Sequence, residues 1–188
     1  MRGLVRVLPA PLALLLGSAV SGPTVIPHPE AKGEALIVPA DSPVHFRGWD
    51  KYGYAQFDGR FVLTGTFVYG CGGNCADYEG PITEGDLQVR VAPDPAVAAR
   101  LPNWKIRHSD MVILITRATD LVRMFATPRQ HAALRAGKIK DLRGRLSIVV
   151  DHFRAGIECD APSFDARFVR VVKAPKVASG KLGEYGCV

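Results

Sequence analysis

Residues 60–69, RFVLTGTFVY, constrain the fold of this chain more than any other segment. They are dense in β-branched and aromatic residues, which favour an extended strand. Alternate positions place three aromatic side chains, Leu63 and Gly65 on one face, and valines and threonines on the other. A glycine in the middle of such a face predicts a bend or bulge of the kind that a closed β-barrel uses.

Other segments carry the apolar patterns of strands, namely residues 86–91, 111–116, 142–153 and 164–173. Side chains alternate along a strand, so Arg167 and Arg170 are expected on opposite faces of the last segment. Residues 121–125 are expected to pair as a strand with 111–116 across a polar turn. Residues 154–156 are expected to form a tight turn after residue 153.

Two short helices are predicted among these strands. Asp94 is placed as the N-cap of the first helix, which should end before Pro102. Thr127 and Gln130 have the spacing of a capping box, and Gly137 is placed to end this second helix. The predicted fold class is therefore mainly β with two short helices, β or α+β.

The order of five features carries a family resemblance. They are a glycine-bearing strand (VLTGTF), a hairpin partner (LQVRV), an inserted helix ending at Gly137, a second glycine-bearing strand (LRGRLSIVV) and a closing strand (ARFVRVV). In this order, over residues 55–173, the chain resembles small exported OB-like β-barrel domains of uncharacterised function. The resemblance implies an OB-like, partly open β-barrel, and it concerns the fold alone. Those families place a histidine-rich segment after the second glycine-bearing strand, where this chain has His152.

The amino terminus has the pattern of a cleavable signal peptide. Arg2 and Arg6 precede the apolar residues 8–16, a run much shorter than the roughly 20 residues of a membrane-spanning helix. Small residues favour cleavage after Ser21, with cleavage after Ala19 as the alternative. An uncleaved anchor is the other interpretation. Export to the periplasm or the exterior is expected, with no transmembrane segment after cleavage.

Four parts of the chain follow from these patterns. They are a signal peptide (1–21), an extended proline-rich lead-in (22–34), a single β-rich domain (35–175) and a carboxy-terminal tail (176–188).

Four cysteines in an exported chain favour disulfides over free thiols. Three pairings are possible. Cys71–Cys75 is favoured because two glycines let the intervening loop fold back, and Cys159–Cys187 because it would tether the tail. A four-thiolate zinc site and a redox-active pair fit the spacing less well. No metal site and no cofactor is predicted.

Charge is concentrated in residues 105–145, which hold ten basic and three acidic side chains. Such an excess is a candidate for contact with an anionic surface, and its plain alternative is a solvated face.

Two groups of residues are candidate sites. Asp151, His152 and Asp160 form the densest ionisable group on a predicted hairpin, where His152 could act as a general base or metal ligand. Because neighbouring residues of a strand face opposite ways, Asp151 and His152 are not expected to act together.

The other group is aromatic. Trp49, Tyr52 and Tyr54 lie among charged residues and glycines in a segment typical of a loop that stacks on sugars or bases, although core packing is the simpler interpretation.

Three classes of function remain open. The first is a non-catalytic exported module that binds an envelope polymer, a glycan or a partner protein through the 49–54 loop and residues 105–145. The second is a hydrolase or metal-dependent enzyme centred on His152, and the third is an accessory subunit of a larger assembly. Nucleic acid is not expected as a partner because of export and a modest net charge.

Overall fold

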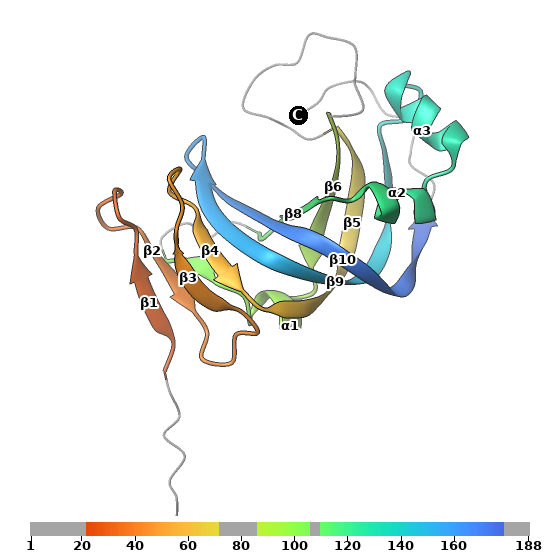
Figure 1. Ribbon diagram of the computed structural model, residues 1–188. Helices are drawn as coiled ribbons and strands as arrows, with labels where there is room; N and C mark the ends of the chain where they lie inside the picture. Colours follow the sequence, from red (N-terminus) through yellow and green to blue (C-terminus); the bar gives the residue numbers. More distant parts are fainter. Residues whose placement is uncertain (1–21, 72–85, 106–109, 179–188) are drawn as a thin grey trace, which may run out of the picture.

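A computed structural model of the chain describes residues 22–71, 86–105 and 110–178 (Figure 1). The helices of this part are α1 (Pro95–Ala98), α2 (Thr119–Phe125) and α3 (Pro128–Arg135). The strands are β1 (Thr24–Pro27), β2 (Ala35–Val38), β3 (His45–Trp49), β4 (Ala55–Asp58), β5 (Arg60–Cys71), β6 (Leu87–Pro93), β7 (Asn103–Trp104), β8 (Ile113–Thr116), β9 (Asp141–Glu158) and β10 (Ala161–Ala178).

The main sheet is partly closed into a ring. Its seven strands lie in the order β10-β8-β6-β5-β9-β4-β3, and β10 pairs a second time, with β9. Strands β8 and β10 run parallel, whereas the other paired strands of this sheet run antiparallel. The predicted fold class, mainly β with a partly open barrel, is confirmed.

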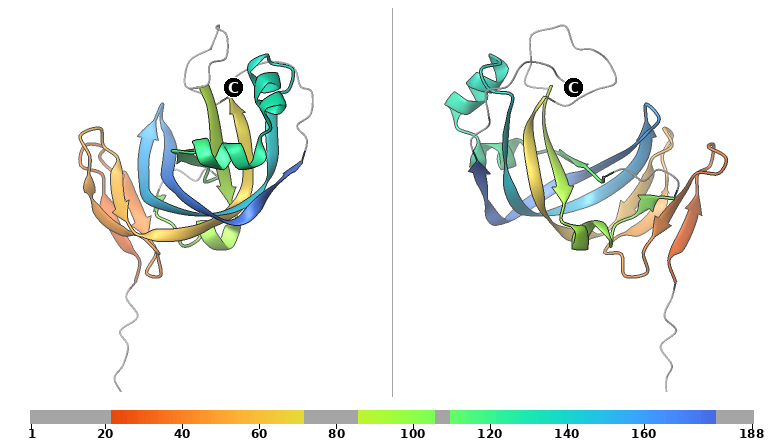
Figure 2. Two further views of the ribbon diagram at one scale, coloured as in Figure 1. Left: turned by 45° about the vertical axis from the view of Figure 1, so that its right-hand side comes forward. Right: turned by 180° about the vertical axis from the view of Figure 1, so that it is seen from behind.

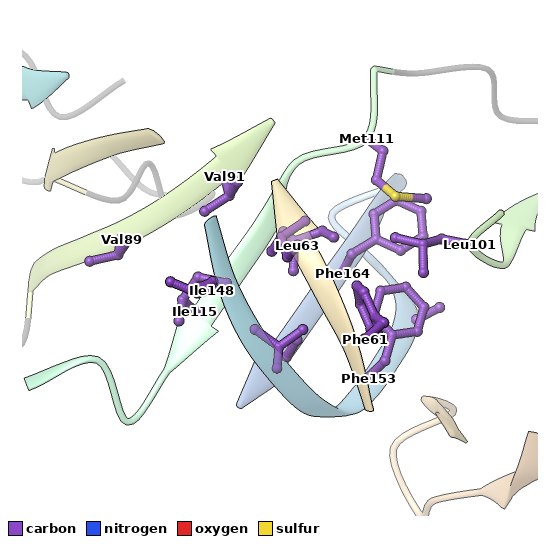
Figure 3. Packing of buried hydrophobic residues seen from close by; sticks show 14 of the residues in the cluster. Phe61, Leu63, Val89, Val91, Leu101, Met111, Ile115, Ile148, Phe153 and Phe164 are labelled. Atoms are coloured by element: carbon purple, nitrogen blue, oxygen red, sulfur yellow. The ribbon is translucent and has the colours of Figure 1, made fainter. Parts of the chain in front are cut away.

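The core lies inside this ring. On β5 the predicted inward face is confirmed, because Phe61, Leu63, Phe67 and Tyr69 are all buried. Figure 3 shows Phe61, Phe153 and Phe164 gathered with other buried side chains of the cluster. The ring centroid of Phe153 lies 6.1 Å from that of Phe61 and 6.1 Å from that of Phe164.

The two strand glycines permit close approach of neighbouring backbones. A Cβ at Gly65 would lie 2.1 Å from the carbonyl oxygen of Ala92, and one at Gly144 would lie 2.0 Å from that of Lys176. The register of β5 runs through Gly65 without a shift, so the expected bulge is not at this position. Bulges occur instead between β9 and β10.

The helix predicted after Thr127 is confirmed in detail. Thr127 and Gln130 form the capping box in both directions. At the other end, Gly137 has a φ of 65°, and the amide of Lys138 donates to the carbonyl of Ala133. These are the features of a helix that ends in a left-handed glycine.

The strand predicted at residues 121–125 is wrong, because these residues belong to helix α2, a third helix of the described chain. Leu121 and Phe125 are its buried residues. The ring of Phe125 lies 4.7 Å from that of Phe67 and 5.6 Å from that of Tyr69, so α2 packs on the inner face of the sheet. Figure 2 shows α2 in front of the curved strands at one end of the ring, next to α3.

The predicted lead-in contains a strand. Thr24–Pro27 forms β1 and pairs antiparallel with β2, which in turn pairs with the short β7. Leu36 and Trp104 are buried in this small sheet. Residues 1–21 and 179–188, with the predicted signal peptide and most of the tail, lie outside the described residues. Within the described part of the chain, no helix has the length and hydropathy needed to cross a membrane.

Candidate functional site

Trp49 packs at the junction of the two sheets. Its side chain is half-buried, and its ring centroid lies 4.9 Å from that of His28 and 6.3 Å from that of Trp104. Phe46 adds a further edge contact at 5.8 Å. These ring contacts make Trp49 part of the packing between the two sheets.

Tyr52 and Tyr54 flank a turn held by one carboxylate. The Oδ1 of Asp50 accepts hydrogen bonds from the amide of Tyr52 at 2.9 Å and from that of Tyr54 at 3.0 Å. The side chain of Tyr52 is 74% exposed. The ring of Tyr54 instead lies against β9, where its hydroxyl bonds to Glu158 and the guanidinium carbon of Arg154 is 5.1 Å from its centre. The structure therefore does not gather the three predicted aromatic residues on one open face.

An ion-pair network lies beneath Tyr54. Arg154 donates to both carboxylate oxygens of Asp165 at 3.0 Å. The Asp50 carboxylate lies 3.7 Å from the same Arg154 guanidinium. Burial raises the pKa of the Asp165 carboxyl above its ordinary value, and the hydrogen bond from Arg154 opposes that rise. These contacts join the β3–β4 hairpin to β9 and β10. The charged groups of Arg154, Asp165 and Asp50 therefore have their partners within the fold.

Asp151 and His152 lie together, contrary to the expectation from strand alternation. His152 has a φ of 50° and stands at a bulge of β9, where Asp151 is opposite both Arg60 and Arg167. A bulge places two successive residues on one side of a strand. As a result the Oδ1 of Asp151 is 3.1 Å from the Nδ1 of His152.

The Asp151 carboxylate is already bound by arginine. Arg167 donates to it twice, at 2.7 and 2.9 Å, and Arg60 lies 3.6 Å away. The hydrogen bonds from Arg167 hold the pKa of Asp151 below its ordinary value. A carboxylate so stabilised is a weak base and a weak support for the exposed imidazole of His152.

Asp160 is remote from this pair. The expected turn at 154–156 is wrong, because these residues are part of β9. The hairpin turns at Cys159 and Asp160, whose φ angles are 46° and 61°, as a two-residue turn of the left-handed type requires. The seven residue steps from Asp151 to Glu158 extend about 23 Å at about 3.3 Å per step. Among the described residues, no group of three or more metal-ligating side chains is arranged around a common point.

The cysteines are only partly described. Cys71 ends β5, and Cys159 lies in the β9–β10 turn. Cys75 and Cys187 lie outside the described residues, so the Cys71–Cys75 and Cys159–Cys187 pairings stay predictions.

A cavity of about 640 Å³ lies between the sheet and the two helices after β8. We call it the α2–α3 cavity. Its volume falls within the range of small-molecule sites, about 300–1,000 Å³. Its apolar lining comes mainly from β6, β8 and α2 and includes Leu87, Val89, Leu114, Ile115 and Val122.

The charged lining of the α2–α3 cavity is basic. Arg117, Arg123 and Arg135 contribute to it, together with His131, and no acidic residue lines it in the described part of the chain. Arg123 is 3.4 Å from Asp120 on the exposed side of α2, a contact that contributes little to stability. Arg117 and Arg135 form no ion pair with any residue that the structure describes.

Arg117 has a strained backbone. It connects β8 to α2 with a φ of 54°, in the left-handed region. This conformation costs a residue other than glycine about 1–2 kcal/mol. Strain of this kind is concentrated at functional positions.

The sequence indicated this site only through its charge. Part of the basic segment 105–145 lines the cavity, whereas Arg143 and Arg145 pair with Asp141 and Asp94 elsewhere. The sequence does not predict the cavity, because the cavity depends on α2, and residues 121–125 of that helix have the apolar pattern of a strand. Arg117, which follows the apolar run 111–116 and has Thr116 and Thr119 nearby, is the sequence feature that could have indicated a polar site here.

Comparison of the chain with protein-family models, with curated proteins and with solved structures finds no match. The function is therefore inferred from the geometry of the molecule.

Proposed function

We propose that the chain is an exported, non-catalytic binding module that holds a small amphipathic anion in the α2–α3 cavity. The observation that carries this proposal is the combination of an apolar wall with three arginines and no lining carboxylate among the described residues. Export rests on the signal-peptide pattern of residues 1–21.

The two kinds of lining suit two parts of one ligand. Leu87, Val122 and Ala126, which are only partly buried, offer an apolar surface to the body of a ligand, where burial is worth about 25 cal/mol per Å². Arg117 and Arg135 offer guanidinium donors to a carboxylate, sulfonate or phosphate, and charge-assisted hydrogen bonds are the stronger kind. An uncharged ligand would gain no charge-assisted hydrogen bonds from these arginines.

The fold supports a binding role. We propose that the ring of β5, β6, β8, β10 and β9 is an OB-like arrangement, with α2 and α3 inserted between β8 and β9 along the chain. OB-folds are five-stranded, partly open barrels that bind ligands. A catalytic role for His152 has less support, because His152 is exposed on the outer face and does not line the cavity.

Two fluorescent probes with the same aromatic skeleton test the proposal. 1-Anilinonaphthalene-8-sulfonate carries an anionic group, and N-phenyl-1-naphthylamine lacks it. We expect the purified protein to bind the sulfonate saturably and at least ten times more tightly than the uncharged probe. Equal affinities, or the absence of saturable binding, would show that the cavity does not select anions.

Matched variants locate the binding. Ala132 lines the cavity on α3, whereas Ala136, at the end of the same helix, does not. Ala132→Trp should fill the cavity and reduce the affinity for the sulfonate at least tenfold. Ala136→Trp should leave it within a factor of two. Equal effects of the two variants would place the probe elsewhere.

A further inference from the structure

Strand β10 carries a basic residue at every third position, namely Arg167, Arg170, Lys173 and Lys176. On a regular strand this spacing would send successive members to opposite faces of the sheet. We call the four residues the β10 basic row. Its orientation is set by the pairing of β10 with β9.

Register shifts place the whole row on one face. The pairing of β10 with β9 is shifted between Phe168 and Arg170, between Val171 and Lys173, and between Lys173 and Lys176. The β9 partners of the row, in order, are Asp151, Val149, Ser147 and Arg145. The β9 residues that alternate with these partners, Leu146, Ile148 and Val150, are buried in the core. The partners of the row therefore lie on the opposite, outer face of β9. The row therefore faces outward throughout.

The fold neutralises only one end of this row. Arg167 is bound by Asp151. Arg170, Lys173 and Lys176 are exposed and form no ion pair with a described residue. Lys176 lies directly opposite Arg145, and like charges in such a cross-strand position are destabilising. The Arg145 guanidinium is 2.7 Å from Asp94, which relieves part of this repulsion.

Bulges are features that re-aim side chains, often at functional positions. Three of them within ten residues here align cations that would otherwise alternate. The β9 partners of the row run from Asp151 to Arg145, six residue steps, so the row extends about 20 Å at about 3.3 Å per step. Next to the middle of the row the same face is uncharged, with Val62 opposite Val149 and Thr64 opposite Ser147, whereas Arg145 and Arg60 add a cation near each end.

We propose that the β10 basic row binds an extended acidic polysaccharide along the outer side of the ring. A linear polyanion matches a single line of cations. Figures 1 and 2 show that β9 and β10 are strongly curved around the core, so their outer side is convex and a flat bilayer would meet only part of the row. Single-stranded nucleic acid is a poorer match, because the row and its outward partners include no aromatic residue on which bases could stack.

A heparin oligosaccharide is the probe for this surface. Arg170→Gln, Lys173→Gln and Lys176→Gln, combined in one variant, should weaken heparin binding at least tenfold. The slope of log Kd against log salt should fall by about 2, since each lost charge contact contributes about 0.7 for a single-stranded polyanion. The matched control combines Arg129→Gln, Lys138→Gln and Lys140→Gln, which remove the same charge from exposed positions around α3. Its affinity should stay within a factor of two.

Several results would overturn the inference. Equal losses in the two triple variants would mean that net charge alone attracts heparin, and an unchanged affinity in the β10 variant would exclude the row. Binding of a thymidine oligonucleotide or of anionic phospholipid vesicles as tight as that of heparin, with the same loss in the β10 variant, would replace the polysaccharide with that partner. Thermal unfolding curves establish that both variants are folded. Ala132→Trp should leave heparin binding unchanged, since this inference does not depend on the α2–α3 cavity.

Discussion

Replacing Arg117 with glycine should stabilise the fold and weaken ligand binding at once. The left-handed backbone of Arg117 costs about 1–2 kcal/mol in the native state, and glycine relieves this cost. Glycine loses about 0.5–1 kcal/mol through the greater freedom of the unfolded chain. The expected net gain in the free energy of unfolding is therefore about 0.5–1 kcal/mol.

Urea unfolding measures this gain. With a denaturant dependence of about 2 kcal/mol per molar urea, the midpoint of unfolding should rise by about 0.3–0.5 M in Arg117→Gly. Arg117→Ala is the matched control, because it removes the guanidinium but keeps the Cβ and hence the strain. Both variants should bind 1-anilinonaphthalene-8-sulfonate at least fivefold more weakly, and only the glycine variant should gain stability. A glycine variant that is less stable than the wild type would exclude backbone strain at Arg117, and one that binds the probe normally would exclude a role of its guanidinium in binding.

Three further perturbations test the architecture around the sites. Thr127→Ala removes the capping box of α3 and should lower the free energy of unfolding by about 1 kcal/mol in thermal denaturation, whereas an unchanged midpoint would mean that the cap contributes nothing. Gly156→Ala places a Cβ 2.5 Å from the Tyr54 ring and should cost about 1–3 kcal/mol in urea unfolding; the same substitution should cost less in a Tyr54→Ala background, and an equal cost would contradict the contact. The lowered pKa of Asp151 means that its carboxylate stabilises the fold above the pKa of the unfolded chain, about 3.9, and that this contribution is lost as pH falls through the lower folded value. Unfolding of Asp151→Asn should therefore depend less on pH between 5 and about 2 than unfolding of the wild type, and parallel profiles would exclude that linkage.

Local signals predicted the elements that depend on local physics. The alternation of residues 60–69 gave the inner face of β5, because burial of one face is enough to define a strand. The capping box at Thr127 and the glycine at Gly137 gave α3, because each satisfies backbone groups at its own end of the helix.

Long-range packing decided what the sequence left ambiguous. A short apolar run such as residues 121–125 suits a strand or a helix equally well, and the contact of Phe125 with Phe67 inside the ring selects the helix. The faces of β9 and β10 follow from bulges, and these arise where two long strands curve around one core. The pairing of Asp151 with His152 and the alignment of Arg167 with Arg170 are therefore properties of the register, which alternation alone does not contain.

The same distinction between local pattern and long-range packing applies to the candidate sites. The charge of residues 105–145 is a candidate for contact with an anionic surface or a solvated face, and composition alone does not decide between the two. The aromatic cluster around Trp49 could not be sorted into core and surface from sequence, because its packing partners His28 and Trp104 come from distant segments.

Amide chemical shifts recorded during titration with 1-anilinonaphthalene-8-sulfonate show where on the protein the anion binds. If the α2–α3 cavity holds the anion, the largest saturable shifts will fall on its lining, at Val89, Ile115, Arg117 and His131. The uncharged probe will produce smaller shifts in the same residues. Shifts centred on Tyr52, or on the outer face around His152, would exclude the α2–α3 cavity as the binding site.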